Sequence, residues 1–195
     1  SKGIPYPTSS VSYQFPDIES ATLSNGSKIY LAQRDGLPLV QMTILLSSGF
    51  AEEDLSELGY TNFMMDMLNE GTKNYSALEF DAALNAIGSS ISYGSGLDSS
   101  YIGVSSLKGS FSDTLDLVVE SLENPLFEDS EISRLQKQRL AGIKQEENQP
   151  SAIAYRKIGK ILYGENHPYG KPLTGTGTTE TIENISRDAL VEVYK

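Results

Sequence analysis

Apolar residues recur at helical spacing between residues 59 and 72, where the chain reads G-Y-T-N-F-M-M-D-M-L-N-E-G-T. One side of a helical wheel collects Tyr60, Phe63, Met64, Met67 and Leu68. This periodicity predicts an amphipathic helix that packs into a core. Asn62 and Asp66 are one turn apart and share the other side of the helix.

Other stretches with helical periodicity cover residues 78–87, 111–122, 129–147 and 150–163. Gly88 ends the first of these helices. Asp129 or Ser130 caps the third, which is predicted to be the longest. Pro150 opens the fourth, because proline is tolerated in a first helical turn. A loop over residues 164–177 and a final helix from Ser186 complete this half of the chain.

The strands have the alternating or short apolar patterns typical of sheets. Asn25-Gly26 is the strongest turn signal and predicts a hairpin leading into a strand over residues 28–33. The run from Val40 to Leu46 predicts a buried strand that ends before Gly49. Residues 89–93 and 100–107 predict two more strands, with small polar residues at alternate positions. This order of elements is α+β, because strands and helices do not alternate as βαβ units.

Two segments differ in composition. Residues 1–19 contain Pro5, Pro7 and Pro16 among serines, which predicts an extended arm or linker. Residues 20–195 have the length of one α+β domain. The apolar pattern of the last helix continues to the end of the chain without a capping residue, so we expect this domain to be truncated at its C-terminal end.

Charge and composition narrow the possible partners. The formal net charge is -11, from 26 acidic and 15 basic residues. This charge opposes binding to nucleic acid or to anionic lipid surfaces. It favours basic peptides, although a charge of this size also simply keeps a protein soluble. No apolar run reaches membrane-spanning length, so no membrane insertion is expected.

Cysteine is absent from the chain, which excludes a disulfide framework and thiolate metal ligands. A cysteine-free chain is compatible with the periplasm and with the cytosol. If the source is bacterial, a periplasmic or cell-envelope location is the expectation.

The spacing of Asn62, Met65 and Asp66 is that of the inverted zinc motif H-x-x-E-H. In that motif the histidines bind the metal and the glutamate acts as general base. Here both imidazoles are missing, and the thioether of Met65 cannot take a proton from water. Asn62 and Asp66 offer oxygen ligands to a hard cation, but such sites assemble more ligands than these two.

The same segment resembles the pitrilysin/insulinase metallopeptidases, which include the mitochondrial processing peptidases and carry G-x-x-H-x-x-E-H-M-x-x-x-G-T. Gly59, Met67, Gly71 and Thr72 match this outline in register. A later stretch, A-G-I-K-Q-E-E-N-Q-P, is similar to the family's E-E-I-x-x-x-x-D-x-P and places Gly142 at the third zinc ligand. The hairpin near the start and G-S-S-I-S-Y-G-S-G-L-D-S-S at residues 88–100 are similar to two further landmarks of the family.

The resemblance implies a processing-peptidase-like half-domain, an antiparallel sheet with helices packed mainly on one face. It also implies a catalytically inactive domain, since the degenerate positions Asn62, Met65, Asp66 and Gly142 supply no metal site. Zinc is then expected in a catalytic half, in the same polypeptide or in a partner subunit. The four positions are expected to lie off the apolar face of their helices, so that the family's residues could be restored there without damage.

The implied role is to complete a substrate chamber and to hold peptides for the catalytic half. Peptides are expected to pair with the strand edge at Ser92, Tyr93 and Gly94. Two alternatives remain open: a purely structural core subunit of a larger complex, and a divergent metal-dependent hydrolase that uses Asn62 and Asp66.

Three other features predict ordinary structure. Gly94-Ser95-Gly96 and Gly175-Thr176-Gly177 lack the third glycine and the lysine of phosphate-binding loops, so we interpret them as turns. His167 is the single histidine, and no nucleophile or acid adjoins it in the sequence. We expect it to pack on Tyr163 or Tyr169.

Overall fold

The computed structural model describes residues 16–34 and 36–195, which group into two compact units separated between Pro38 and Leu39. The first unit contains an antiparallel hairpin of β1 (Ile18–Thr22) and β2 (Lys28–Ala32). Gly26 has a φ of 87°, and the amide of Ser27 donates to Asn25 Oδ1 at 3.0 Å. The predicted hairpin is confirmed. Most of the predicted arm lies outside the described residues, and its predicted end at residue 19 falls inside β1.

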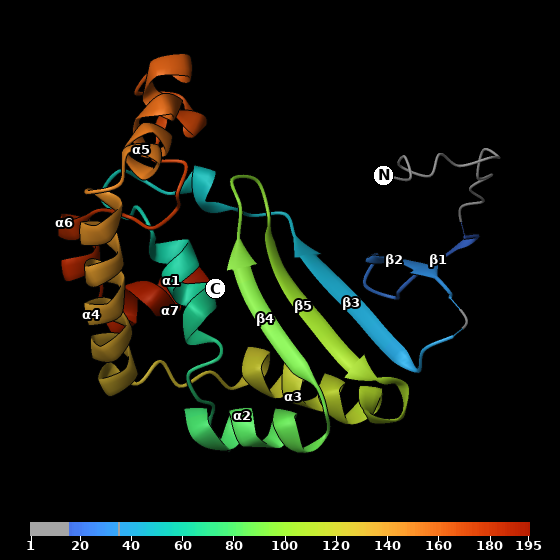
Figure 1. Cartoon of the computed structure of the whole chain (residues 1–195). Coiled ribbons are helices and arrows are strands. Elements are labelled where there is room, and N and C mark those ends of the chain that lie inside the picture. Colours follow the sequence, from blue (N-terminus) through green and yellow to red (C-terminus); the bar gives the residue numbers. More distant parts are fainter. Residues whose placement is uncertain (1–15, 35) are drawn as a thin grey trace, which may run out of the picture. The chain divides into compact units, whose positions relative to one another are not determined.

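The second unit is built on a three-stranded antiparallel sheet in the order β3-β5-β4. Its strands are β3 (Leu39–Leu46), β4 (Ser90–Ser95) and β5 (Ser100–Leu107). Ile44 lies opposite Ile102, and Ile102 lies opposite Tyr93, so side chains of the same face line up across the sheet. The strand β4 is an edge strand beside α1 (Tyr60–Met67) (Figure 1).

The remaining helices follow the predicted order along the chain. They are α2 (Ala77–Ala86), α3 (Phe111–Glu123), α4 (Asp129–Glu146), α5 (Pro150–Tyr163), α6 (Thr179–Glu183) and α7 (Arg187–Tyr194). Short 3-10 turns lie at η1 (Phe50–Glu52), η2 (Lys108–Ser110) and η3 (Pro168–Gly170). The helix α6 was not predicted from the sequence. Thr178 and Thr181 form its capping box, and this was the one local signal for it.

Helices cover one face of the sheet, as predicted for this α+β fold. Ile102 and Val104 of β5 are buried there with Phe63 and Met67 of α1. On the opposite face the side chains of Leu39, Leu45, Tyr101 and Leu107 are exposed.

The prediction that β3 is buried is therefore wrong for one of its faces, where Leu45 is 71% exposed. An unbroken apolar run does not say whether both faces of a strand are covered. Among the described residues, no helix has both the length and the apolar character that crossing a membrane requires.

Candidate functional site

The start of α1 is fixed by a buried carboxylate and a close backbone approach. Glu53 accepts hydrogen bonds from the amides of Gly59, at 2.8 Å, and Thr61, at 2.7 Å. Burial raises the pKa of Glu53, and these two hydrogen bonds oppose the rise. Gly59 has a φ of 90°, and a Cβ there would lie 2.7 Å from the backbone of Gly177. The glycine is required because the helix begins against the loop of residues 174–177.

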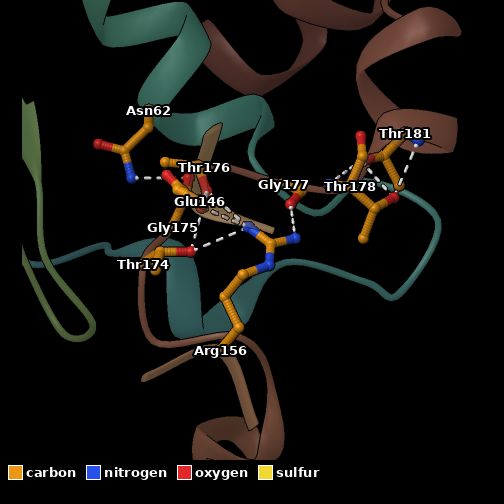
Figure 2. A network of polar contacts seen from close by, with 9 residues as sticks. All are labelled: Asn62, Glu146, Arg156, Thr174, Gly175, Thr176, Gly177, Thr178 and Thr181. Carbon is orange, nitrogen blue, oxygen red and sulfur yellow. Dashed lines mark hydrogen bonds and ion pairs between the residues drawn. The ribbon is translucent and has the colours of Figure 1, made fainter. Parts of the chain in front are cut away.

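Asn62 connects this loop to the end of β4. Its Nδ2 donates to the carbonyl of Gly175 at 3.2 Å, and its Oδ1 accepts from the amide of Ser95 at 3.2 Å. Figure 2 shows the contact with Gly175. The side chain at the first degenerate position is thus bound to two backbone groups.

Met65 is buried in the core, with 1% of its surface exposed. The expectation that all four degenerate positions lie off the apolar face is wrong at this residue. The apolar side of α1 is wider than the wheel predicted, because α7 packs on α1 in addition to the sheet. A glutamate in this place would be a buried carboxylate.

Asp66 forms an ion pair with Arg139 of α4. Partial burial raises the pKa of Asp66, while the charge of Arg139 acts in the opposite direction. Arg139 lies 73 residues away in the sequence, so no local pattern indicated this contact. Gly142 lies one turn further along α4 and lines the same cleft as the pair.

Gly142 lies at an open position. A Cβ built on it would meet no atom within 4 Å outside its own helix. It lines an open cleft of about 480 Å³ between α1 and α4. The cleft is lined by residues that include Phe63, Asp66, Arg139, Gly142, Glu146 and Thr176.

A second polar network closes the end of this cleft (Figure 2). Arg156 of α5 donates to Glu146 Oε2 at 2.7 Å, to Thr176 Oγ1 at 2.9 Å and to the carbonyl of Gly177 at 2.6 Å. Thr176 also donates to Glu146 at 2.9 Å. These bonds hold the loop of residues 174–177 between α4, α5 and α1. Neither Glu146 nor Arg156 was singled out from the sequence, because their partners are distant or in a loop.

The predicted peptide-binding residues Ser92, Tyr93 and Gly94 lie on the edge strand β4. The hydroxyl of Tyr93 bonds to Ser121 of α3 at 2.5 Å, and burial raises its pKa to about 12. Gly94 lies under the ring of Tyr101, because a Cβ there would be 2.7 Å from that ring. Tyr93 therefore points into the core, whereas Ser92 and Gly94 belong to the open face.

The loop predictions also have clear outcomes. The ring of His167 stacks on Tyr163 with centroids 5.0 Å apart, and its Nδ1 accepts from the amide of Tyr169 at 3.0 Å. The predicted packing is confirmed. Gly175 and Gly177 have φ values of 64° and 82°, a backbone conformation that residues with side chains rarely adopt and that suits the predicted turn. The turn predicted at residues 94–96 is wrong for Gly94 and Ser95, which lie in β4, because the strand continues to the turn at Gly96.

The sequence profile of the insulinase family (peptidase family M16) matches residues 29–177. The chain belongs to this family. Among curated relatives, the Non-peptidase homolog YmxG of Helicobacter pylori is 25% identical over 158 residues, which are 81% of this chain and 36% of the relative. An uncharacterized zinc protease of Rickettsia felis is 22% identical over 157 residues, covering 80% of this chain and 38% of the relative.

Solved structures of M16 proteins share the fold. The peptidase M16 inactive domain from Pseudomonas fluorescens matches with a TM-score of 0.84 and 22% identity, over 91% of this chain and 43% of that one. A protease from Helicobacter pylori matches with a TM-score of 0.79 and 18% identity, over 92% of this chain and 43% of that one. The chain thus spans less than half the length of these relatives.

The residues at the zinc positions predicted from the sequence do not fit zinc. The amide of Asn62 is bound to backbone groups, Asp66 is paired with Arg139, and Gly142 has no side chain. Residues 16–34 and 36–195 contain no group of three or more His, Cys, Asp or Glu side chains placed to hold a metal ion. With Met65 at the place of the general base, this M16 domain is catalytically inactive.

Proposed function

We propose that this chain forms part of the wall of an M16 substrate chamber and binds extended peptides for a catalytic half. The observation that carries the proposal is the free edge of β4, which runs beside α1, the helix that carries the family's metal site. A peptide that pairs with such an edge gains affinity through backbone hydrogen bonds and makes few demands on side chains. That mode suits a chamber that accepts varied peptides.

Two further observations support this role. The open face of β4 and β5 carries small or polar residues at Ser90, Ser92, Gly94, Gly103 and Ser105, together with the exposed side chains of Tyr101, whose ring lies over Gly94, and Leu107. Around Ser92 and Gly103 the small side chains leave room for a ligand over the sheet. The net charge of -11 favours basic peptides over acidic ones.

The catalytic half is part of the proposal. This chain spans 36% and 38% of the two curated relatives described above. Zinc would then be bound by another half of the same polypeptide or by a partner subunit. In that arrangement the present domain contributes substrate binding and no hydrolysis.

The register of β4 determines which of its backbone amides point away from β5 and could bind a peptide. The amide of Gly96 donates to the carbonyl of Ser99 at 2.8 Å and closes the β4–β5 turn. Backbone groups alternate in direction along an antiparallel strand. Gly94 and Ser92 therefore bond to β5, whereas Tyr93 and Ile91 direct their amides to the free edge. A proline at Ser92 would break the sheet itself, so Ile91 is the residue to change.

The test compares Ile91→Pro with Ile91→Ala, because both lose the side chain and only proline loses the outward amide. The probe is a fluorescein-labelled decapeptide of alternating lysine and valine, followed by anisotropy. We expect Ile91→Pro to bind about fivefold more weakly than Ile91→Ala, the effect of one net hydrogen bond of about 1 kcal/mol. The same peptide with alternate backbone amides methylated should bind weakly to both variants.

Circular dichroism should show that both variants are folded. Equal affinity of the two folded variants for the unmodified peptide would exclude β4 as the binding edge. Mass spectrometry of the peptide after incubation should show no cleavage by this chain.

A further inference from the structure

We propose that Asn62 ends the peptide-binding edge of β4 by occupying the outward amide of Ser95. The inference rests on the proposed function of that edge and specifies how far along β4 a bound peptide can pair. A bound peptide can pair with the outward amides of Ile91 and Tyr93 but cannot continue past Tyr93. Asn62 is thereby a residue that determines the position and length of the bound segment.

The direction of the Ser95 amide follows from two independent contacts. The Gly96–Ser99 hydrogen bond closes the turn and places Ser95, Tyr93 and Ile91 in the outward set. The bond from the Ser95 amide to Asn62 Oδ1, at 3.2 Å, shows that this amide does point away from β5. Among the described residues, no group outside the sheet accepts a hydrogen bond from the amide of Tyr93 or Ile91. The outward amides of Ile91 and Tyr93 are thus open to a peptide, whereas the outward amide of Ser95 is occupied by Asn62.

The orientation of the Asn62 amide is fixed by its partners. The contact with Ser95 is made by its backbone N–H and the contact with Gly175 by its backbone carbonyl, so the oxygen of Asn62 faces Ser95 and its nitrogen faces Gly175. Gly175 cannot retreat, because Arg156 holds the neighbouring Thr176 and Gly177 (Figure 2). A Cβ on Gly175 would lie 2.4 Å from Asn62 Nδ2. The loop therefore packs closely against the side chain of Asn62, which contacts the edge strand through Ser95.

This arrangement gives the lost zinc position a role in substrate binding. Asn62 lies where the family's motif has its first histidine. Because its two bonds span from the loop to β4, the side chain occupies the end of the strand edge that a longer peptide would use. Outward amides recur every second residue, about 7 Å apart along a strand. The open edge thus admits a short paired segment whose next residue must turn away at Ser95.

Hydrogen exchange measured by NMR tests the contact without any peptide. Asn62→Ala removes both bonds, whereas Asn62→Asp keeps an acceptor for Ser95 and loses the donor to Gly175. We expect the Ser95 amide to be protected in the wild-type chain and in Asn62→Asp, and to exchange at least about tenfold faster in Asn62→Ala. Loosening of the loop at residues 174–177 should be common to both variants. Unchanged protection of Ser95 in Asn62→Ala would overturn the inference.

Binding of the lysine–valine decapeptide tests whether Asn62 limits peptide pairing along β4. With the Ser95 amide released, Asn62→Ala should bind it about fivefold more tightly than the wild-type chain, and Asn62→Asp should bind it with wild-type affinity. Equal affinity of the wild-type chain and Asn62→Ala overturns this inference alone. Absence of binding to all three proteins overturns the proposed function and the inference with it.

Discussion

At the scale of single residues, the degenerate zinc positions hold side chains that bind other parts of the protein. Asn62 joins β4 to the loop of residues 174–177, and Asp66 joins α1 to Arg139 of α4. These contacts link α1 to β4, to the loop and to α4. The sequence predicted that these positions lack the family's zinc ligands, because ligand chemistry depends on residue type. It could not predict the new partners, which lie 33 to 113 residues away.

Substitutions of Met65 should change the free energy of unfolding according to the polarity of the new side chain. Its side chain is 1% exposed among apolar neighbours, so Met65→Glu should lower the free energy of unfolding by about 3 kcal/mol or more. Met65→Leu keeps the volume and should cost less than about 1.5 kcal/mol. Urea denaturation of the two variants measures the difference. A folded Met65→Glu protein of wild-type stability would show that this position opens to solvent.

At the scale of elements, periodicity predicted the positions of the helices well. It predicted less well which faces of the helices and strands are buried. The helices α1 to α5 occur where the sequence predicted them. Burial was harder to predict, because it depends on neighbours from elsewhere in the chain. Ser106 is 1% exposed although it is polar, since its hydroxyl bonds to Ser89 and Thr114 in the interior. Conversely, the apolar Leu45 of β3 is exposed on the open face.

Among the described residues, the α-helices contain two glycines, and we expect opposite effects of substitution at them. Gly142 of α4 has open space where a Cβ would lie, so Gly142→Ala should stabilise the protein by about 0.5–1 kcal/mol through helix propensity. Gly159 of α5 is different, because a Cβ there would lie 2.4 Å from the carbonyl oxygen of Tyr169. Gly159→Ala should destabilise by about 1–3 kcal/mol. Thermal unfolding distinguishes the signs, and a destabilising Gly142→Ala would mean that the cleft is closed at this point.

At the scale of the whole chain, the M16 fold is present without the side chains of the predicted zinc site. The sheet still offers an edge strand and an open face, and α1 and α4 still face each other across a cleft. The sequence landmarks predicted this fold because glycines such as Gly59 are required by backbone geometry and not by zinc. What they could not predict is the cation that Arg139 places at the cleft. The positive charge of Arg139 should therefore affect any zinc site restored in this cleft.

Restoring ligands should create zinc binding only when the charge of Arg139 is also removed. Asn62→His, Asp66→His and Gly142→Glu together place three ligands on α1 and α4, but the loss of Asp66 leaves Arg139 unpaired beside them. Repulsion between this guanidinium and Zn²⁺ should weaken binding by about tenfold or more relative to the same variant with Arg139→Gln. Met65 is retained in both proteins, so neither should hydrolyse peptides. Isothermal titration with zinc, with the wild-type chain as control, measures the affinities. Equal zinc affinity with and without Arg139 would show that its guanidinium turns away from the cleft once Asp66 is lost.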